Sequence, residues 1–204
     1  MDIMMNIRWL TTLFMAAMFW AGGALAEGNA LHGRQLAAGC AACHGDDGNG
    51  NAPIFPKLAG QHAGYLAKQL HDFKSGARPE TTMSAMAAPL SDADIMDLAA
   101  WYAEQTVRVE KTEGNREGER LFQIGSIDQK IPACSACHGP EGRGHAAAGF
   151  PDLHGQYSAY IDKTLGDYKS GDRHNDRNEM MRMIASRLSE DQIKAVADYL
   201  AGLR

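Results

Sequence analysis

The sequence predicts an all-α protein built from two tandem copies of one small domain. A Cys-x-x-Cys-His motif occurs at residues 40–44 and again at 134–138, and a Phe-Pro-x-Leu-x-Gly-Gln segment occurs at 55–61 and again at 150–156. Each second copy follows the first by 94 or 95 residues, so the chain repeats itself at a long period. Apolar residues between these motifs recur at helical spacing, and the sequence has no alternating strand pattern of useful length.

Length, composition and charge set the first limits. The 204 residues are 45% hydrophobic and 22% charged, which is ordinary for a globular protein of one or two domains. Lysine and arginine total 20 against 25 aspartates and glutamates, so the formal net charge is -5. Because binding to a phosphate backbone draws on a surplus of basic residues, nucleic acid is not an expected partner.

Residues 1–26 have the pattern of a secretory signal peptide. Arg8 precedes an apolar stretch at 9–21, and the stretch is followed by the small-x-small sequence Ala24-Leu25-Ala26. The alternative is a retained membrane anchor, but the apolar run is shorter than the roughly 20 residues that a spanning helix needs. We therefore expect cleavage after Ala26 and an exported mature chain at 27–204.

The repeat divides the mature chain into a first domain at 27–108, a linker at 109–114 and a second domain at 115–204. The linker is charged and has little to bury. Each domain predicts three helices. The first precedes the cysteine pair and contains Leu31, Gln35 and Leu36 in one copy, and Leu121 and Phe122 in the other. The second has one face made of Tyr65, Leu66, Gln69, Leu70 and Phe73, matched by Tyr160, Ile161, Leu165 and Tyr168.

The third predicted helix begins at a serine in both copies. Ser189 with Gln192 fits a capping box, whereas Ser91 with Asp94 is a weaker version of it. The two helices continue with the apolar positions Ile95, Leu98, Ala99 and Tyr102, and Ile193, Val196, Ala197 and Leu200.

The four cysteines indicate two covalently bound haem c groups. Cys-x-x-Cys-His is the attachment signature of c-type haem, in which two thiols add to the vinyl groups and the adjacent histidine binds the iron. The residues concerned are Cys40, Cys43 and His44 in the first copy, and Cys134, Cys137 and His138 in the second. Disulfides and a four-cysteine zinc site are the alternatives. A zinc ribbon usually separates its cysteine pairs by about 15 to 20 residues, whereas a whole repeat intervenes here.

The second iron ligand is predicted from the register of the repeat. When the third helices are aligned, Met83 falls opposite Met181, and this is the only position with methionine in both copies. Methionine elsewhere is ordinary core filler. None of the remaining histidines aligns with another histidine, so ligation by two histidines is disfavoured and we expect these residues to be structural or at the surface.

On these motifs the chain resembles the class I c-type cytochromes, and among them the diheme cytochrome c4 family of bacterial periplasms, over nearly all of residues 28–204. The resemblance implies two class I cytochrome c domains related by a pseudo-twofold axis, low-spin haems with histidine and methionine ligands, and a periplasmic location. It also implies that the carbonyl of Pro53 accepts a hydrogen bond from the His44 ring nitrogen that does not bind iron. In the second copy Ala148 aligns with Pro53.

The same resemblance implies an electron carrier that delivers electrons to a terminal oxidase or a similar redox partner. Iron with both axial positions filled favours outer-sphere electron transfer, and methionine ligation raises the reduction potential. One alternative is the haem relay subunit of a larger, flavocytochrome-like dehydrogenase. Another is a diheme peroxidase, which would need an open iron position.

The sequence favours no enzyme activity of the chain itself. The glycine-rich stretch at 45–50 follows a haem motif and not a strand, so it is not a dinucleotide-binding loop. We expect redox proteins as partners, either an oxidase or a complex that oxidises quinol or substrate. Membrane association would be loose and would occur through these partners.

Overall fold

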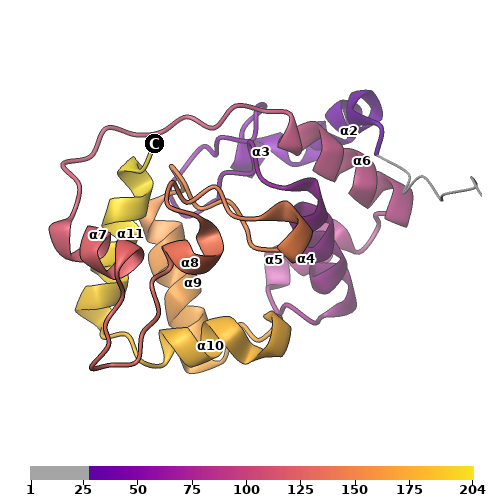
Figure 1. Cartoon of the computed structure of the whole chain (residues 1–204). Helices are drawn as coiled ribbons and strands as arrows, with labels where there is room; N and C mark the ends of the chain where they lie inside the picture. Colours follow the sequence, from indigo (N-terminus) through magenta and orange to yellow (C-terminus); the bar gives the residue numbers. More distant parts are fainter. Residues whose placement is uncertain (1–27) are drawn as a thin grey trace, which may run out of the picture.

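The computed structural model describes residues 28–204, and the predicted signal peptide at 1–26 lies outside the described residues. The N-terminal half contains α2 (Ala30–Leu36), η1 (Ala37–Gly39), α3 (Ala41–His44), α4 (Ala63–Ser75), α5 (Thr81–Ala87) and α6 (Asp92–Ala103). The C-terminal half contains α7 (Arg116–Gln123), α8 (Ser135–His138), η2 (Ala146–Ala148), α9 (Ser158–Ser170), η3 (Arg177–Glu179), α10 (Met180–Ala185) and α11 (Glu190–Gly202). Figure 1 shows the two halves side by side.

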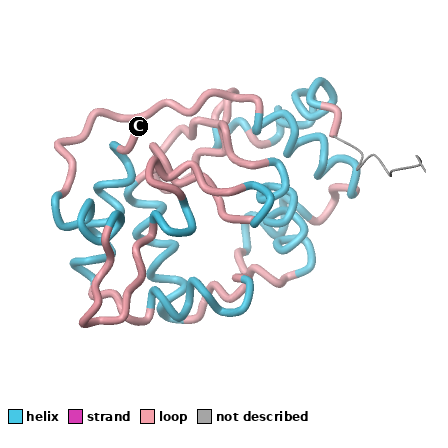
Figure 2. Tube along the Cα trace, viewed as in Figure 1, coloured by secondary structure: helices cyan, strands magenta, loops and turns pink. Residues whose placement is uncertain are grey.

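Helices and loops make up the whole of the described part of the chain (Figure 2). Its only sheet-like features are two isolated antiparallel bridges, Ser126 with Ile131 and His145 with Phe150. The all-α prediction is confirmed. Within residues 28–204, no helix combines the length and the apolar content that a membrane span requires.

In both halves the first and last helices cross at a glycine. A Cβ atom added to Gly33 of α2 would lie 1.9 Å from the carbonyl oxygen of Asp97 in α6. One added to Gly118 of α7 would lie 2.0 Å from the carbonyl oxygen of Ala195 in α11. The first helix therefore packs through its backbone. Leu31, which we assigned to its apolar pattern, is 75% exposed.

The last helices form the centre of each core, as predicted. The apolar positions of α6 are buried with Leu66 and Ala67 of α4, and those of α11 are buried with Ile161 and Leu165 of α9. Both α6 and α11 begin with a complete capping box. The box of Ser91 and Asp94 is therefore not weak, because the shorter carboxylate still accepts from the Ser91 N–H at 2.9 Å.

Each half also has a short helix that periodicity did not predict. Helix α5 packs against α4, and α10 packs against α9. They have seven and six residues, which is too short for a helical repeat of apolar positions to be recognised in the sequence.

The segment between α6 and α7 runs along one edge of the molecule and joins the two halves (Figure 1). Its first part is bound to the N-terminal half. Asn49 donates to Thr106 O at 3.0 Å and accepts from Arg108 N at 2.6 Å, and Lys57 Nζ donates to Arg108 O at 2.5 Å.

The contacts between the halves occur in pairs with exchanged roles. Arg78 donates to the Tyr160 hydroxyl at 3.0 Å, and Arg173 donates to the Tyr65 hydroxyl at 3.0 Å. Arg78 aligns with Arg173 in the repeat, and Tyr65 aligns with Tyr160. A contact between positions i and j that recurs between j and i is the mark of a twofold axis. The two halves are therefore related by a pseudo-twofold axis.

Candidate functional site

Each Cys-x-x-Cys-His motif folds into a single helical turn. The backbone N–H of His44 donates to Cys40 O at 3.0 Å, and that of His138 donates to Cys134 O at 2.9 Å. Residues three apart in a helix share a face, so the turn places both cysteines of a pair on one side. Neither cysteine pair is joined by a disulfide in this structure.

The two motif histidines are buried, with 6% exposure for His44 and 7% for His138. Nδ1 of His44 lies 2.9 Å from Pro56 O, and Nδ1 of His138 lies 3.0 Å from Pro151 O. Because a carbonyl oxygen can only accept, Nδ1 carries the proton and the lone pair is on Nε2. Burial lowers the pKa of both rings, against the opposing effect of the proline carbonyls. Each ring is thus a neutral imidazole with Nε2 available to a metal.

Pro56, and not Pro53, supplies the carbonyl that holds His44. Pro53 is exposed and lies within a turn closed by a hydrogen bond from Phe55 N to Ala52 O. The turn brings the chain back so that Pro56 meets the ring. The Pro53 assignment is therefore wrong. Pro56 and Pro151 share one position in the repeated segment, so the second half does not depart from the first here.

A glycine fixes the other end of the Phe-Pro-x-Leu-x-Gly-Gln segment. Gly60 N donates to Tyr102 O at the end of α6, and Gly155 N donates to Leu200 O in α11, at 2.9 and 3.0 Å. Their φ angles are 69° and 64°, in the left-handed region where only glycine is unstrained. The segment thus ties the histidine-holding proline to the last helix of its own half.

These donor groups fit a c-type haem. Each turn offers two thiols for thioether bonds and one imidazole nitrogen for iron. Burial raises the pKa of Cys134 to about 11 and also raises the pKa of Cys40. Among residues 28–204, no three His, Cys, Asp or Glu side chains are gathered into a metal-binding group.

The predicted methionine ligands have equivalent places in the two halves. Met83 lies in α5 and Met181 in α10, the short helices that precede the two capped helices, and both side chains are half-buried. Met86 and Met183, on the same two helices, are 44% and 50% exposed.

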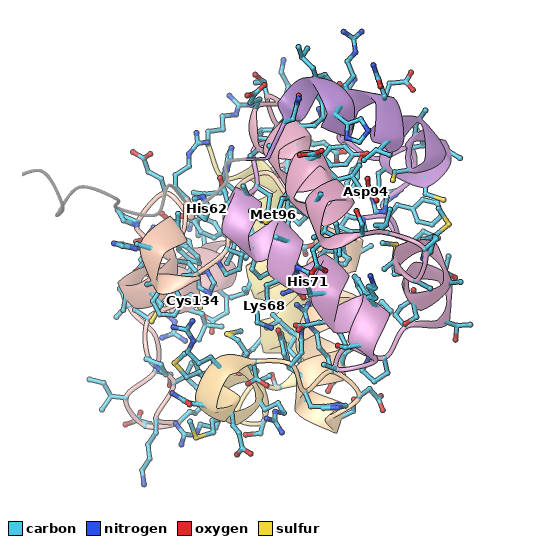
Figure 3. The ribbon with its side chains drawn as sticks, turned by 90° about the vertical axis from the view of Figure 1, so that its right-hand side faces the viewer. His62, Lys68, His71, Asp94, Met96 and Cys134 are labelled. Atoms are coloured by element: carbon cyan, nitrogen blue, oxygen red, sulfur yellow. The ribbon has the colours of Figure 1, made fainter. Side chains whose placement is uncertain are left out.

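Most of the other histidines have local structural partners or face solvent, whereas the Nε2 atom of His62 is buried without a hydrogen-bond partner. His154 is buried and is bonded to Arg143 and Asp152. His71 is 44% exposed beside Asp92 on the neighbouring helix. Figure 3 looks onto the N-terminal half and shows His62 and His71 along α4, with Cys134 of the other half to one side.

Two residues at the interface between the halves were not predicted to have a role. Gln61 and Gln156 end the repeated segment, and each is bonded to the backbone of the opposite half. The recurrence of both glutamines was visible in the sequence. Their partners were not, because alignment of the copies pairs equivalent positions and does not pair positions in contact.

The cytochrome c family matches the chain twice, at residues 30–104 and 116–204. Cytochrome c4 of Pseudomonas aeruginosa is 46% identical, over 89% of this chain and 92% of that relative. The thiosulfate dehydrogenase electron acceptor of Stutzerimonas stutzeri is 38% identical, over 98% of this chain and 97% of that relative. The crystal structure of reduced recombinant cytochrome c4 from Pseudomonas stutzeri is similar at a TM-score of 0.84 and 44% identity, covering 87% of this chain and 100% of that one.

The paired attachment turns, the twofold-related halves and these similarities over nearly the whole length lead to one assignment. The chain belongs to the cytochrome c family, and within it to the diheme cytochromes c4, which are electron carriers with two covalently bound haem c groups.

Proposed function

We propose that this chain moves single electrons between redox proteins through two haems of equivalent ligation. Cys40 and Cys43 would hold the first haem, with His44 and Met83 as its axial ligands. Cys134 and Cys137 would hold the second, with His138 and Met181. The observation that carries this proposal is the pair of Nδ1 hydrogen bonds, which leave both Nε2 atoms as free ligands.

The chemistry of electron transfer would come from the haem iron, which alternates between the ferrous and ferric states. The protein's own groups position it. The proline carbonyls fix the tautomer and the orientation of the two imidazoles, which is the usual task of a group bonded to a metal-binding histidine. With histidine and methionine on each iron, no position would remain open for a substrate, so we propose a carrier without enzyme activity.

We also propose a place for this carrier in a redox chain. The main proposal is delivery to a terminal oxidase after export to the periplasm. The second candidate is a relay that accepts electrons from a dehydrogenase, and the name of one relative, a thiosulfate dehydrogenase electron acceptor, favours this role. Co-purification of a tagged chain from its own host tests the choice, because a stable dehydrogenase partner would support the relay.

Haem content tests the proposal as a whole. The exported protein should give two haems per chain in a pyridine haemochrome assay, and acid acetone should not extract them because thioethers keep haem on the chain. A value of one haem, or zinc found by elemental analysis, would contradict the proposal. Hydrogen peroxide turnover by the pure protein would contradict the assignment as a carrier alone.

A further inference from the structure

We propose that Gln61 and Gln156 are positioning residues that act across the interface. Each fixes, in the opposite half, the peptide group whose carbonyl holds the iron-binding histidine. This inference rests on the proposed ligation by His44 and His138. It adds that each haem site is completed by a side chain from the other half.

Gln61 binds the backbone of one residue of the C-terminal half through two hydrogen bonds. Its Oε1 accepts from Asp152 N at 3.0 Å, and its Nε2 donates to Asp152 O at 2.8 Å. Asp152 N belongs to the same planar peptide group as Pro151 O, which accepts from His138 Nδ1. A single rigid amide thus connects Gln61 to His138. Gln61 is 7% exposed, so solvent does not compete for these bonds.

Gln156 makes the same connection in the reverse direction. Its Oε1 accepts from Lys57 N at 2.9 Å, and its Nε2 donates to Lys57 O at 2.9 Å. Lys57 N shares its peptide group with Pro56 O, the acceptor for His44 Nδ1. Gln156 is 8% exposed.

Each glutamine is itself held in place by the helix that follows it. Gln61 Oε1 also accepts from His62 N, and Gln156 Oε1 also accepts from Tyr157 N, both at 3.0 Å. His62 and Tyr157 are the N-cap residues of α4 and α9. Each of these glutamines is therefore fixed by its own half, and its side chain is oriented to bind the backbone of the opposite half.

The hydrogen bonds from each glutamine should lower the reduction potential of the haem in the opposite half. Hydrogen bonds in a chain polarise one another, so a bond accepted from the amide N–H makes the carbonyl of that amide a stronger acceptor. A stronger bond at Nδ1 makes the imidazole a more basic ligand. A more basic ligand favours ferric iron and lowers the reduction potential. Loss of Gln61 should therefore raise the potential of the haem at His138, and loss of Gln156 that of the haem at His44.

The test uses the full-length protein with both haems. Gln61→Met and Gln156→Met keep the side-chain length and remove the amide. We expect crossed results in redox titrations: Gln61→Met shifts only the wave of the C-terminal haem upward, and Gln156→Met only that of the N-terminal haem. Exchange of the His138 Nδ1 proton, followed by NMR, should become about fivefold faster in Gln61→Met, as for the loss of one ordinary hydrogen bond. This signal also identifies which half has changed.

Tyr65→Phe is the matched control. It removes a hydrogen bond between the halves, to Arg173, and touches neither proline, so both waves should stay in place. If the methionine variants do not fold, Gln61→Asn and Gln156→Asn retain a neutral amide that is one methylene too short, and the crossed shift must appear there.

The outcomes separate this inference from the proposed function. Shifts confined to the half that carries the substitution, equal shifts of both waves, or no shift with an intact spectrum would overturn the inference. A wild-type spectrum without low-spin histidine and methionine ligation would instead overturn the proposed ligand set.

Discussion

Met83 and Met181 have the same register, the same kind of short helix and the same half-buried setting. Register is what separates Met181 from Met180, which is also half-buried in α10 but aligns with Thr82 of the first copy. Met86 and Met183 share these helices, but about half of each side chain meets solvent. A thioether that binds iron must face the interior of its half, so their exposure assigns Met86 and Met183 to the surface.

Alanine substitutions should therefore divide the methionine-to-iron absorption between two residues. This weak ferric band near the red end of the spectrum should lose about half its intensity in Met83→Ala, and the other half in Met181→Ala, because each iron contributes one such bond. Met86→Ala and Met183→Ala are the controls and should leave the band unchanged. Loss of the band in a control variant would show that the ligands have been assigned to the wrong register.

At the scale of elements, the crossing of the first and last helices depends on having no side chain at one position. Gly118→Ala would push a methyl group into the backbone of α11, so we expect a loss of about 1–3 kcal/mol in the free energy of unfolding. Gly166→Ala is the matched control in α9. It has nothing within 4 Å, so it should stabilise the protein by about 0.4–1 kcal/mol. Chemical denaturation of both variants measures the difference, and equal effects would contradict the close approach.

A carboxylate holds the start of α2 against α6. Asp97 accepts from His32 Nδ1 at 2.7 Å and from Asn29 N at 2.6 Å, and these two bonds, chiefly the one from His32, lower its pKa below the ordinary 3.8. The unfolded chain then binds a proton at a pH where the folded chain does not. This contribution to stability is present above the ordinary pKa and is lost as the pH falls through the lowered value.

Replacing the Asp97 carboxylate should make the stability of the protein depend less on pH in the acid range. Asp97→Asn should lose less stability than the wild type when thermal unfolding is compared at about pH 5 and about pH 3, because the titrating group is gone. Asp128→Asn, in an exposed loop, should keep the wild-type slope. An unchanged slope in Asp97→Asn would mean that other carboxylates govern acid unfolding.

The secondary-structure elements also differ in how well the sequence predicted them. The apolar faces of α4, α6, α9 and α11 were predictable because each repeats over three or more turns. The helix crossings at Gly33 and Gly118 could not be predicted, because a glycine that allows two backbones to approach adds no apolar side chain to the sequence pattern. The acceptor at Pro56 was missed for another reason: it lies only three positions after Pro53 in the same loop, and the turn between them decides which carbonyl reaches the ring. The cysteines and histidines of the haem motifs could be predicted without knowledge of the fold, because haem attachment requires their spacing in the sequence.

At the scale of the molecule, charge is divided unequally between the halves. Residues 27–114 contain 7 basic and 11 acidic residues, whereas residues 115–204 contain 12 and 13. Negative charge stabilises the ferric state, which carries one more positive charge at the iron. Screening over a Debye length of about 8 Å at physiological salt reduces the effect but does not change its sign.

The N-terminal haem should accordingly titrate at the lower potential. Electrons would then pass from the N-terminal haem to the C-terminal one, and the acceptor would dock nearer the C-terminal half. A redox titration of the wild type and of Met83→His checks this order, because a second histidine ligand should lower the N-terminal wave. If the wave that moves is the higher of the two wild-type waves, the order is reversed.

The interface between the halves has the symmetry of a homodimer but no longer the composition of one. Lys57 and Asp152 hold the same repeat position with opposite charge. The Lys57 ammonium donates to Gly155 O at 2.8 Å and lies 4.4 Å from the centre of the Tyr157 ring, where the first copy has His62. Two N-terminal halves placed together would lack that ring and would bring two ammonium groups to the joint. The two halves have therefore become chemically complementary at this interface, because the ammonium group of one half lies against the ring of the other.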